Sequence, residues 1–316
     1  MNEQNFNLAF VFPGQGSQTV GMLSELAEVY PVVKQTFAQA TDILGIKLWD
    51  LVAHGPAEEL DQTQNTQPAL LAAGVAVWRV WCENFGIRPA WMAGHSLGEY
   101  TALVCSGAIS FEDAIKLVAA RGRLMQEAVP VGEGAMAAIL GLEDHQVVGG
   151  CAEAAQGDIV TAANFNAPGQ VVIAGETAAV ERAMLTLKAM GAKRTLKLPV
   201  SVPSHCGLMT HAAERLAEIL HDINVGMPNT TLIHNADVKS HSSPEVIKFA
   251  LKEQLYKSVR WVESIKLMRD QGVSAFVECG PGKVLMGLNK RIAPAAMHLT
   301  MFDTDSIHNV VEQLHG

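Results

Sequence analysis

The strongest local signal in this 316-residue chain is Trp91-Met92-Ala93-Gly94-His95-Ser96-Leu97-Gly98-Glu99-Tyr100. The first three residues are apolar and predict a buried strand, and the residues after Gly98 predict a helix. Between them, Gly94 to Gly98 form a G-x-S-x-G sequence, the pattern of a nucleophile elbow, in which a sharp turn exposes a serine hydroxyl. The glycines let strand and helix pass closely, and the first N–H groups of the helix can stabilise an oxyanion. The motif alone leaves two interpretations open, a catalytic nucleophile and a structural turn.

The composition bounds the class of protein. Hydrophobic residues make up 49% of the chain and charged residues 17%, which is typical of a globular protein with a large core, either one big domain or a domain with a smaller insert. No apolar run reaches transmembrane length and the N-terminus is not basic, so we expect neither a membrane partner nor a signal peptide. The net charge of −9 argues against nucleic-acid binding. The five scattered cysteines, without a CxxC pair, predict a reducing compartment, the cytoplasm, and no metal site.

The order of the predicted elements indicates two subdomains. Residues 8–12 predict a first buried strand that ends at a Pro-Gly-Gln-Gly loop, and helical patterns follow. The segment 131–199 changes character, because its predicted elements follow the order βαββαβ, which is typical of a ferredoxin-like fold. After this segment the α/β pattern resumes. The sequence therefore predicts an α/β fold, with an α/β-hydrolase-like large subdomain (1–130 and 200–316) and an inserted ferredoxin-like small subdomain (131–199).

His205 is the best candidate for the base that a serine nucleophile needs at about pH 7. It follows Pro203-Ser204, where the predicted insert returns to the main subdomain, and clefts form at such junctions. A structural histidine is the alternative interpretation. His95 is expected to point away from Ser96, as in other elbows. The acids between Ser96 and His205 do not lie in convincing strand-end loops, so we expect a neutral group such as a carbonyl oxygen to orient the base.

Arg121 is predicted to lie on the apolar face of a helix over residues 112–127, on one stripe with Leu117 and Met125. A buried guanidinium is costly unless it meets an anion. Two interpretations are open, an internal pair with an Asp or Glu and a bidentate clamp for a substrate carboxylate.

Gln15 lies in the loop that follows the first predicted strand. A loop at the carboxyl end of a strand can aim a backbone N–H at an oxyanion, and the N–H of Leu97, next to the elbow serine, would be its partner. A plain turn is the alternative interpretation.

Taken together, these motifs resemble those of bacterial malonyl-CoA:acyl carrier protein transacylases along nearly the whole chain. Several motifs agree in the family's order, which is far more specific than one elbow. The matching stretches are Phe12-Pro13-Gly14-Gln15-Gly16-Ser17-Gln18, Gly94-His95-Ser96-Leu97-Gly98-Glu99-Tyr100, Arg121-Gly122-Arg123, Asn164-Phe165-Asn166-Ala167-Pro168-Gly169-Gln170, Val202-Pro203-Ser204-His205, Gln254-Leu255, Val259-Arg260-Trp261 and Glu278-Cys279-Gly280-Pro281-Gly282.

The resemblance implies roles for individual residues. Ser96 would be the acylated nucleophile, His205 its base, and Gln254 the residue whose carbonyl oxygen orients His205. The backbone N–H groups of Gln15 and Leu97 would form the oxyanion hole. Arg121 would pair with the malonyl carboxylate. The remaining implied contacts are Met125, Met136, Val200 and Ser204 for the acyl pocket, and Asn166 and Arg194 for the CoA or pantetheine arm.

The implied activity is that of an acyl-carrier-protein S-malonyltransferase. Such an enzyme transfers malonyl from malonyl-CoA to the phosphopantetheine thiol of acyl carrier protein, by a ping-pong mechanism through a malonyl-serine, and supplies fatty acid elongation. We expect no cofactor, no metal and a monomer, and we expect Lys193, Arg194 and Lys197 to meet an acidic carrier. Ser258 stands where the family usually has a proline, so we expect a less rigid loop and a less firmly placed Gln254.

Three other interpretations compete with this one. A serine esterase or thioesterase shares the elbow and the histidine but has no need of a buried cation facing the acyl group. A stand-alone acyltransferase that loads polyketide carriers would share the chemistry and differ only in context. A carrier-docking module without catalysis would not need Ser96, His205 and Gln254 intact.

Overall fold

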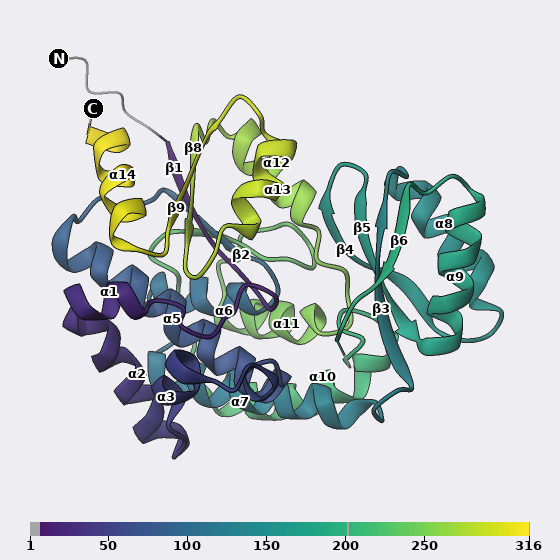
Figure 1. The fold of residues 1–316 in the computed structure, drawn as a ribbon, viewed down its shortest axis with the longest axis horizontal. Coiled ribbons are helices and arrows are strands. Elements are labelled where there is room, and N and C mark those ends of the chain that lie inside the picture. Colours follow the sequence, from purple (N-terminus) through teal and green to yellow (C-terminus); the bar gives the residue numbers. More distant parts are fainter. Residues whose placement is uncertain (1–6, 201, 316) are drawn as a thin grey trace.

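The computed structural model describes residues 7–200 and 202–315 and places them in two β-sheets with surrounding helices (Figure 1). The larger sheet is parallel, with the strand order β7-β2-β1-β8-β9. Its strands, in that order, are Thr231–Ile233, Trp91–Gly94, Leu8–Phe12, Ala275–Cys279 and Met297–Met301. The central strand β1 is buried along its whole length, as expected for a parallel sheet that is covered on both faces.

Alternate side chains of β1 enter two different hydrophobic cores. Phe10 and Phe12 pack in the core beneath α5 (Thr63–Asn84), α6 (Leu97–Cys105), α7 (Phe111–Ala128) and α10 (Thr210–Asp222), whereas Val11 packs in the core with α12 (Trp261–Asp270) and α13 (Val284–Ile292). This division follows from the two-residue period of a strand. The other helices of this part are α1 (Ser24–Val29), α2 (Pro31–Leu44), α3 (Leu48–His54), α4 (Ala57–Leu60), the 3-10 helix η1 (Gly207–Met209), α11 (Pro244–Gln254) and α14 (Thr304–His315).

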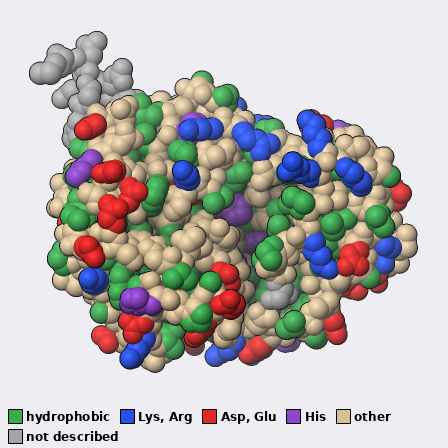
Figure 2. Space-filling view, in the orientation of Figure 1, with side chains coloured by type: hydrophobic (Ala, Val, Ile, Leu, Met, Phe, Trp, Pro, Cys, Tyr) green, Lys and Arg blue, Asp and Glu red, His purple; other side chains and the backbone are tan. Residues whose placement is uncertain are grey.

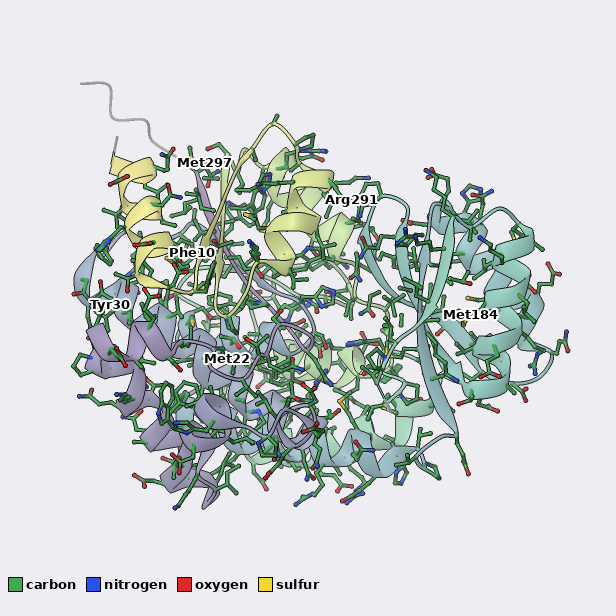
Figure 3. All side chains as sticks on the ribbon, viewed as in Figure 1. Phe10, Met22, Tyr30, Met184, Arg291 and Met297 are labelled. Carbon is green, nitrogen blue, oxygen red and sulfur yellow. The ribbon has the colours of Figure 1, made fainter. Side chains whose placement is uncertain are left out.

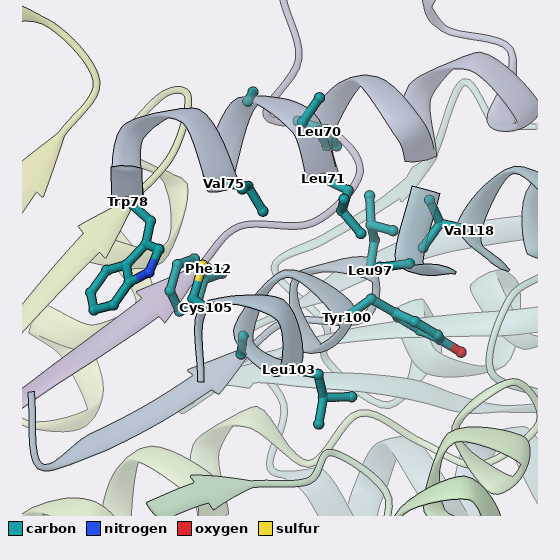
Figure 4. Close-up of a cluster of buried hydrophobic side chains, with 14 of the residues drawn as sticks. Phe12, Leu70, Leu71, Val75, Trp78, Leu97, Tyr100, Leu103, Cys105 and Val118 are labelled. Atoms are coloured by element: carbon teal, nitrogen blue, oxygen red, sulfur yellow. The ribbon is translucent and has the colours of Figure 1, made fainter. Parts of the chain in front are cut away.

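Helix α5 is the central helix of the first core. Its residues from Thr66 to Trp78 are all buried, and a helix that is apolar on all sides must lie inside a protein. Figure 4 shows Leu71 and Val75 of this helix pointing toward the elbow helix α6. Packing in this core therefore fixes the position of α6 against the sheet, and with it the position of Ser96, the residue just before α6.

The smaller sheet is antiparallel and has the order β4-β5-β3-β6. Its strands, in chain order, are β3 (Gly134–Leu140), β4 (Val160–Ala167), β5 (Gln170–Glu176) and β6 (Arg194–Lys197), and its helices are α8 (Asp144–Ala155) and α9 (Thr177–Ala189). The two helices share one hydrophobic core with one face of the sheet. This βαββαβ order was predicted from the sequence, and the predicted fold class is confirmed.

The loop after α11 links the two parts. Val259 exchanges backbone hydrogen bonds with β4, from its N–H to Ala163 and from the Phe165 N–H to its carbonyl, each at 2.9 Å. The hydroxyl of Ser258 donates to the carbonyl of Ala162 at 2.6 Å. A proline has no hydroxyl and could not make this contact. Ser258, which departs from the family pattern, therefore adds a hydrogen bond between the loop and β4.

Arg291 of α13 makes a second link. Its guanidinium donates to the Gln170 side chain at 2.6 Å and to the Pro168 carbonyl at 2.5 Å, both at the turn between β4 and β5 (Figure 3). Within the described residues, no helix is both long enough and apolar enough to cross a membrane.

Candidate active site

Ser96 lies in a sharp turn between β2 and α6. Its φ is 51° and its ψ is −110°, a backbone conformation that non-glycine residues rarely adopt. The turn needs both glycines, since a Cβ on Gly94 would lie 1.9 Å from the carbonyl carbon of Gly98, and a Cβ on Gly98 would lie 2.0 Å from the Phe12 oxygen. The elbow predicted from the sequence is therefore present, with the serine as the residue before the helix.

His205 lies within hydrogen-bond distance of the serine. Its Nε2 is 2.7 Å from Ser96 Oγ, and its Nδ1 is 2.6 Å from the backbone oxygen of Gln254. A carbonyl oxygen only accepts, so Nδ1 carries the proton and Nε2 is left to accept from the serine. The neutral group expected as orienter is thus a main-chain carbonyl.

The surroundings of His205 keep its imidazole neutral. The ring is almost completely buried, with 2% of the residue exposed. Burial first, and the nearby Arg121 cation second, lower the pKa of His205 to about 3. A neutral imidazole is the form that can take a proton from Ser96.

Arg121 projects from α7 into the same space and is 1% exposed. Its Nη1 donates to the Gln67 side-chain oxygen at 2.9 Å, and its Nη2 donates to the Gln254 side-chain oxygen at 3.0 Å and to Ser96 Oγ at 3.3 Å. All three partners are uncharged, and among the described residues no carboxylate forms an ion pair with Arg121. Its buried Nε has no partner there either. The interpretation as an internal Arg–acid pair is therefore wrong.

Two backbone N–H groups are available beside the serine. The Leu97 N–H is the first of α6, and the Gln15 N–H lies in the loop after β1; neither donates a backbone or side-chain hydrogen bond within residues 7–200 and 202–315. The Ser96 N–H is not available in this way, since it donates to Asn235 Oδ1 at 2.7 Å. The two free N–H groups are those that the sequence pointed to.

A cavity of about 200 Å³ connects these groups. It lies between the two sheets, where Figure 2 shows a hollow with histidine side chains inside it, Lys and Arg along its upper rim and acidic side chains along its lower rim. The predicted residues that line it, besides the nucleophile, the base and Arg121, are Gln15, Leu97, Met125, Met136, Asn166, Val200 and Ser204. Arg194 does not line it and is exposed on β6.

Several residues of the site were missed from the sequence. His95 was expected only to point away from Ser96, and its place in the site was not foreseen: it lines the cavity, with its Nε2 2.7 Å from Asn166 Oδ1 and its ring 5.5 Å from that of Trp261. Burial lowers the pKa of His95, so this ring is also neutral. Asn164 lines the cavity beside it.

Asn235 was missed as well. Its side chain accepts from the Ser96 N–H and donates to the Gly94 carbonyl, each at 2.7 Å, so it holds both sides of the strained turn. No signal in the sequence identified it, because an asparagine after a short strand is ordinary turn chemistry. Within the described part of the chain, no group of three His, Cys, Asp or Glu side chains is arranged to hold a metal ion.

Comparison with known proteins agrees with this geometry. The acyl transferase domain family matches residues 9–293. The chain is 55% identical over 307 residues to the malonyl CoA-acyl carrier protein transacylase of Haemophilus influenzae, covering 97% of this chain and 98% of that protein. The crystal structure of an acyl carrier protein S-malonyltransferase from Vibrio cholerae is 56% identical, with a TM-score of 0.95 over 96% of this chain and 99% of that one. A malonyl-transacylase in complex with a type II polyketide acyl carrier protein is also 56% identical, with a TM-score of 0.96 over 97% and 99% of the two chains.

Proposed function

The chain belongs to the malonyl-CoA:acyl carrier protein transacylases, and we propose that Ser96, His205 and Arg121 carry out the transfer. The enzyme moves a malonyl group from malonyl-CoA to the thiol of acyl carrier protein. Ser96 is the group that holds the malonyl between the two halves of the reaction. We further propose that the product supplies fatty acid elongation in the cytoplasm.

The first half of the reaction loads the enzyme. His205 Nε2 accepts the proton from Ser96 Oγ across their 2.7 Å contact, as the oxygen attacks the thioester carbonyl carbon of malonyl-CoA. The N–H groups of Gln15 and Leu97 stabilise the oxyanion. When the intermediate collapses, the C–S bond breaks, and CoA leaves as a thiol with the proton from His205. The product of this half is a malonyl ester on Ser96.

The second half reverses these steps with a different thiol. The phosphopantetheine thiol of the carrier gives its proton to His205 and its sulfur attacks the ester, and Ser96 Oγ leaves and takes the proton back. One thioester replaces another, so no external oxidant, metal or cofactor enters the balance. The carbonyl of Gln254 holds the same tautomer of His205 through both halves.

The observation that carries the malonyl assignment is the buried cation beside the nucleophile. Arg121 faces the cavity with only uncharged partners, and burying such a cation is costly unless an anion arrives with the substrate. A malonyl group attached to Ser96 ends in a carboxylate. An esterase or a thioesterase for neutral acyl groups shares the Ser96–His205 pair but has no use for this cation.

The small sheet is proposed to be a separate subdomain, residues 131–199, that closes one wall of the acyl site. Met136 of β3 and Val172 of β5 line the cavity opposite the elbow. We propose that Met125, Val200 and Ser204 complete the acyl pocket. The CoA or pantetheine arm is then assigned to Asn166, Arg194 and the rim around them, and the enzyme is proposed to act as a monomer.

Mass spectrometry of the intact protein tests the proposal. After mixing with malonyl-, methylmalonyl- or acetyl-CoA, we expect a stable malonyl adduct on the wild-type protein and none on Ser96→Ala. Ser240→Ala is the matched control, since this serine is exposed and does not line the cavity, and it should still gain the malonyl mass. An adduct that persists in Ser96→Ala would refute the nucleophile assignment, and an equal preference for acetyl would refute the role of Arg121.

A further inference from the structure

Glu99 is a carboxylate with no exposed surface, buried beneath the nucleophile. It lies three residues after Ser96, in the first turn of α6. Its Oε1 accepts from His234 Nδ1 at 2.7 Å. Its Oε2 accepts from the backbone N–H of Asn235 at 3.0 Å and from the Gln254 side-chain amide at 2.9 Å. A buried carboxylate with three donors around it is a fixed part of the structure, and none of the steps described above uses it.

The Gln254 amide connects this carboxylate to Arg121. Its Nε2 donates to Glu99 and, at 2.8 Å, to the backbone oxygen of Ser96, while its Oε1 accepts from Arg121 Nη2 at 3.0 Å. Carboxylates and carbonyls only accept and guanidinium only donates, so the amide fits in one orientation. Glu99 therefore fixes the orientation of this amide, and the amide oxygen in turn accepts the hydrogen bond from Arg121.

We propose that Glu99 is a positioning residue that holds the Gln254 side-chain amide and thereby aims Arg121 at the carboxylate of the acyl group. This inference rests on the proposed function, because it concerns the same acyl site. Glu99 has no hydrogen bond to Arg121 and reaches it through the Gln254 amide; its other two partners are His234 and the backbone N–H of Asn235. The negative charge of Glu99 and the positive charge of Arg121 lie on opposite sides of that amide, which polarises the two hydrogen bonds that join the amide to these residues.

The backbone and the side chain of Gln254 then have separate roles. The main-chain oxygen holds His205 Nδ1, whereas the side-chain amide holds Arg121. Disturbing the amide should therefore reduce the preference for malonyl more than it reduces the reactivity of Ser96. A residue with a purely structural role would lower acylation by malonyl and by acetyl to the same extent.

The test compares acylation of the full-length protein by malonyl-CoA and by acetyl-CoA, measured as kcat/KM for adduct formation on Ser96. In Glu99→Ala we expect the malonyl-to-acetyl ratio to fall by about 10- to 100-fold, the range for losing one hydrogen bond to a charged group. In an Arg121→Ala background, the same substitution should leave the ratio unchanged, because the group that Glu99 aims is gone. Thr101→Val is the matched control, since this buried residue of α6 faces Gly74 of α5 and should keep the wild-type ratio.

Gln254→Ala keeps the main-chain oxygen that holds His205 and deletes only the amide. We expect it to lower the ratio in the same range, and to add little when combined with Glu99→Ala. Should Glu99→Ala fail to fold, Gln254→Ala and the milder Glu99→Gln, whose neutral oxygen accepts more weakly, decide the question. An unchanged ratio in these variants, or a fall that persists without Arg121, would overturn the proposal. Failure of wild-type Ser96 to become acylated would instead refute the proposed function.

Discussion

Replacing Arg121 with alanine should abolish the preference for malonyl and leave Ser96 able to react with a neutral acyl group. Two N–H groups of the guanidinium have no acceptor among the described residues, the buried Nε–H and the second hydrogen of Nη1. The two forks of a guanidinium pair Nη2 with either Nε or Nη1, so a bidentate substrate carboxylate accepts one of these free hydrogens together with the Nη2 hydrogen that makes the long 3.3 Å contact to Ser96 Oγ. It would gain about 1.5–3 kcal/mol from each bond, or about 3–6 kcal/mol together. Losing this amount predicts a fall of about 10²- to 10⁴-fold in kcat/KM for malonyl-CoA.

Acetyl-CoA has no carboxylate, so its acylation should fall much less. The only direct contact between Arg121 and the nucleophile is the long one to Ser96 Oγ, at 3.3 Å. Quenched-flow measurement of the covalent adduct with each thioester gives both constants on the same protein sample. Arg121→Lys keeps the charge but not the fork, and should fall between wild type and alanine for malonyl alone. A parallel loss with both thioesters would refute the reasoning, because it would mean that Arg121 supports the serine and not the substrate.

Four further results are expected. The pKa of His205 is lowered to about 3 from an ordinary 6.5, which keeps the base neutral. The rate of single-turnover acylation should therefore stay constant from about pH 8 to about pH 5. A fall in this rate with a midpoint near pH 6.5 would contradict the prediction. The unfolded chain binds a proton to this histidine more readily below 6.5, so stability should decline as the pH falls from there toward 3. Ser258→Ala removes the bond to the Ala162 carbonyl and should cost about 1 kcal/mol in urea unfolding, whereas an unchanged midpoint would show that the bond contributes nothing. Lys193→Glu, at an exposed residue just before β6, should raise the KM for the carrier and leave malonyl-CoA acylation unchanged, and an equal loss of both would argue against a docking role.

The fold was predictable where local patterns are strong. Strand β1, the elbow and the βαββαβ order of the small sheet follow from runs of apolar residues and from glycine positions. The edge strand β9 (Met297–Met301) and the C-terminal helix α14 (Thr304–His315) were not predicted. An edge strand is only partly buried, and the segment Met-His-Leu-Thr-Met lacks the continuous apolar run of the central strands.

The site was predictable only where a side chain has a motif or an unusual position. Ser96 has its elbow, and Arg121 has an apolar stripe on which a cation is out of place. The third member of the catalytic group could not be found from the residues, because a backbone carbonyl has no sequence signature; only the family resemblance pointed to Gln254. Glu99 was hidden for another reason, since an acid in the first turn of a helix ordinarily faces solvent and the helix dipole favours it there.

The third member of the catalytic group is the uncharged carbonyl of Gln254, and this suits a transferase whose substrate carries a charge. In the free site, Arg121 adds to the burial that lowers the pKa of His205. A malonyl carboxylate bound to Arg121 offsets that contribution and raises the pKa of His205, while burial, the larger cause, still keeps the ring neutral. A base is more effective as its pKa approaches the working pH, and the carboxylate stays on Arg121 while the carrier thiol attacks. An aspartate behind His205 would make the imidazole a strong base whichever acyl group is bound. It would also make it a strong base toward water. The carbonyl of Gln254 orients the ring without that charge, so burial and the charges of Arg121 and of the acyl group set the strength of the base.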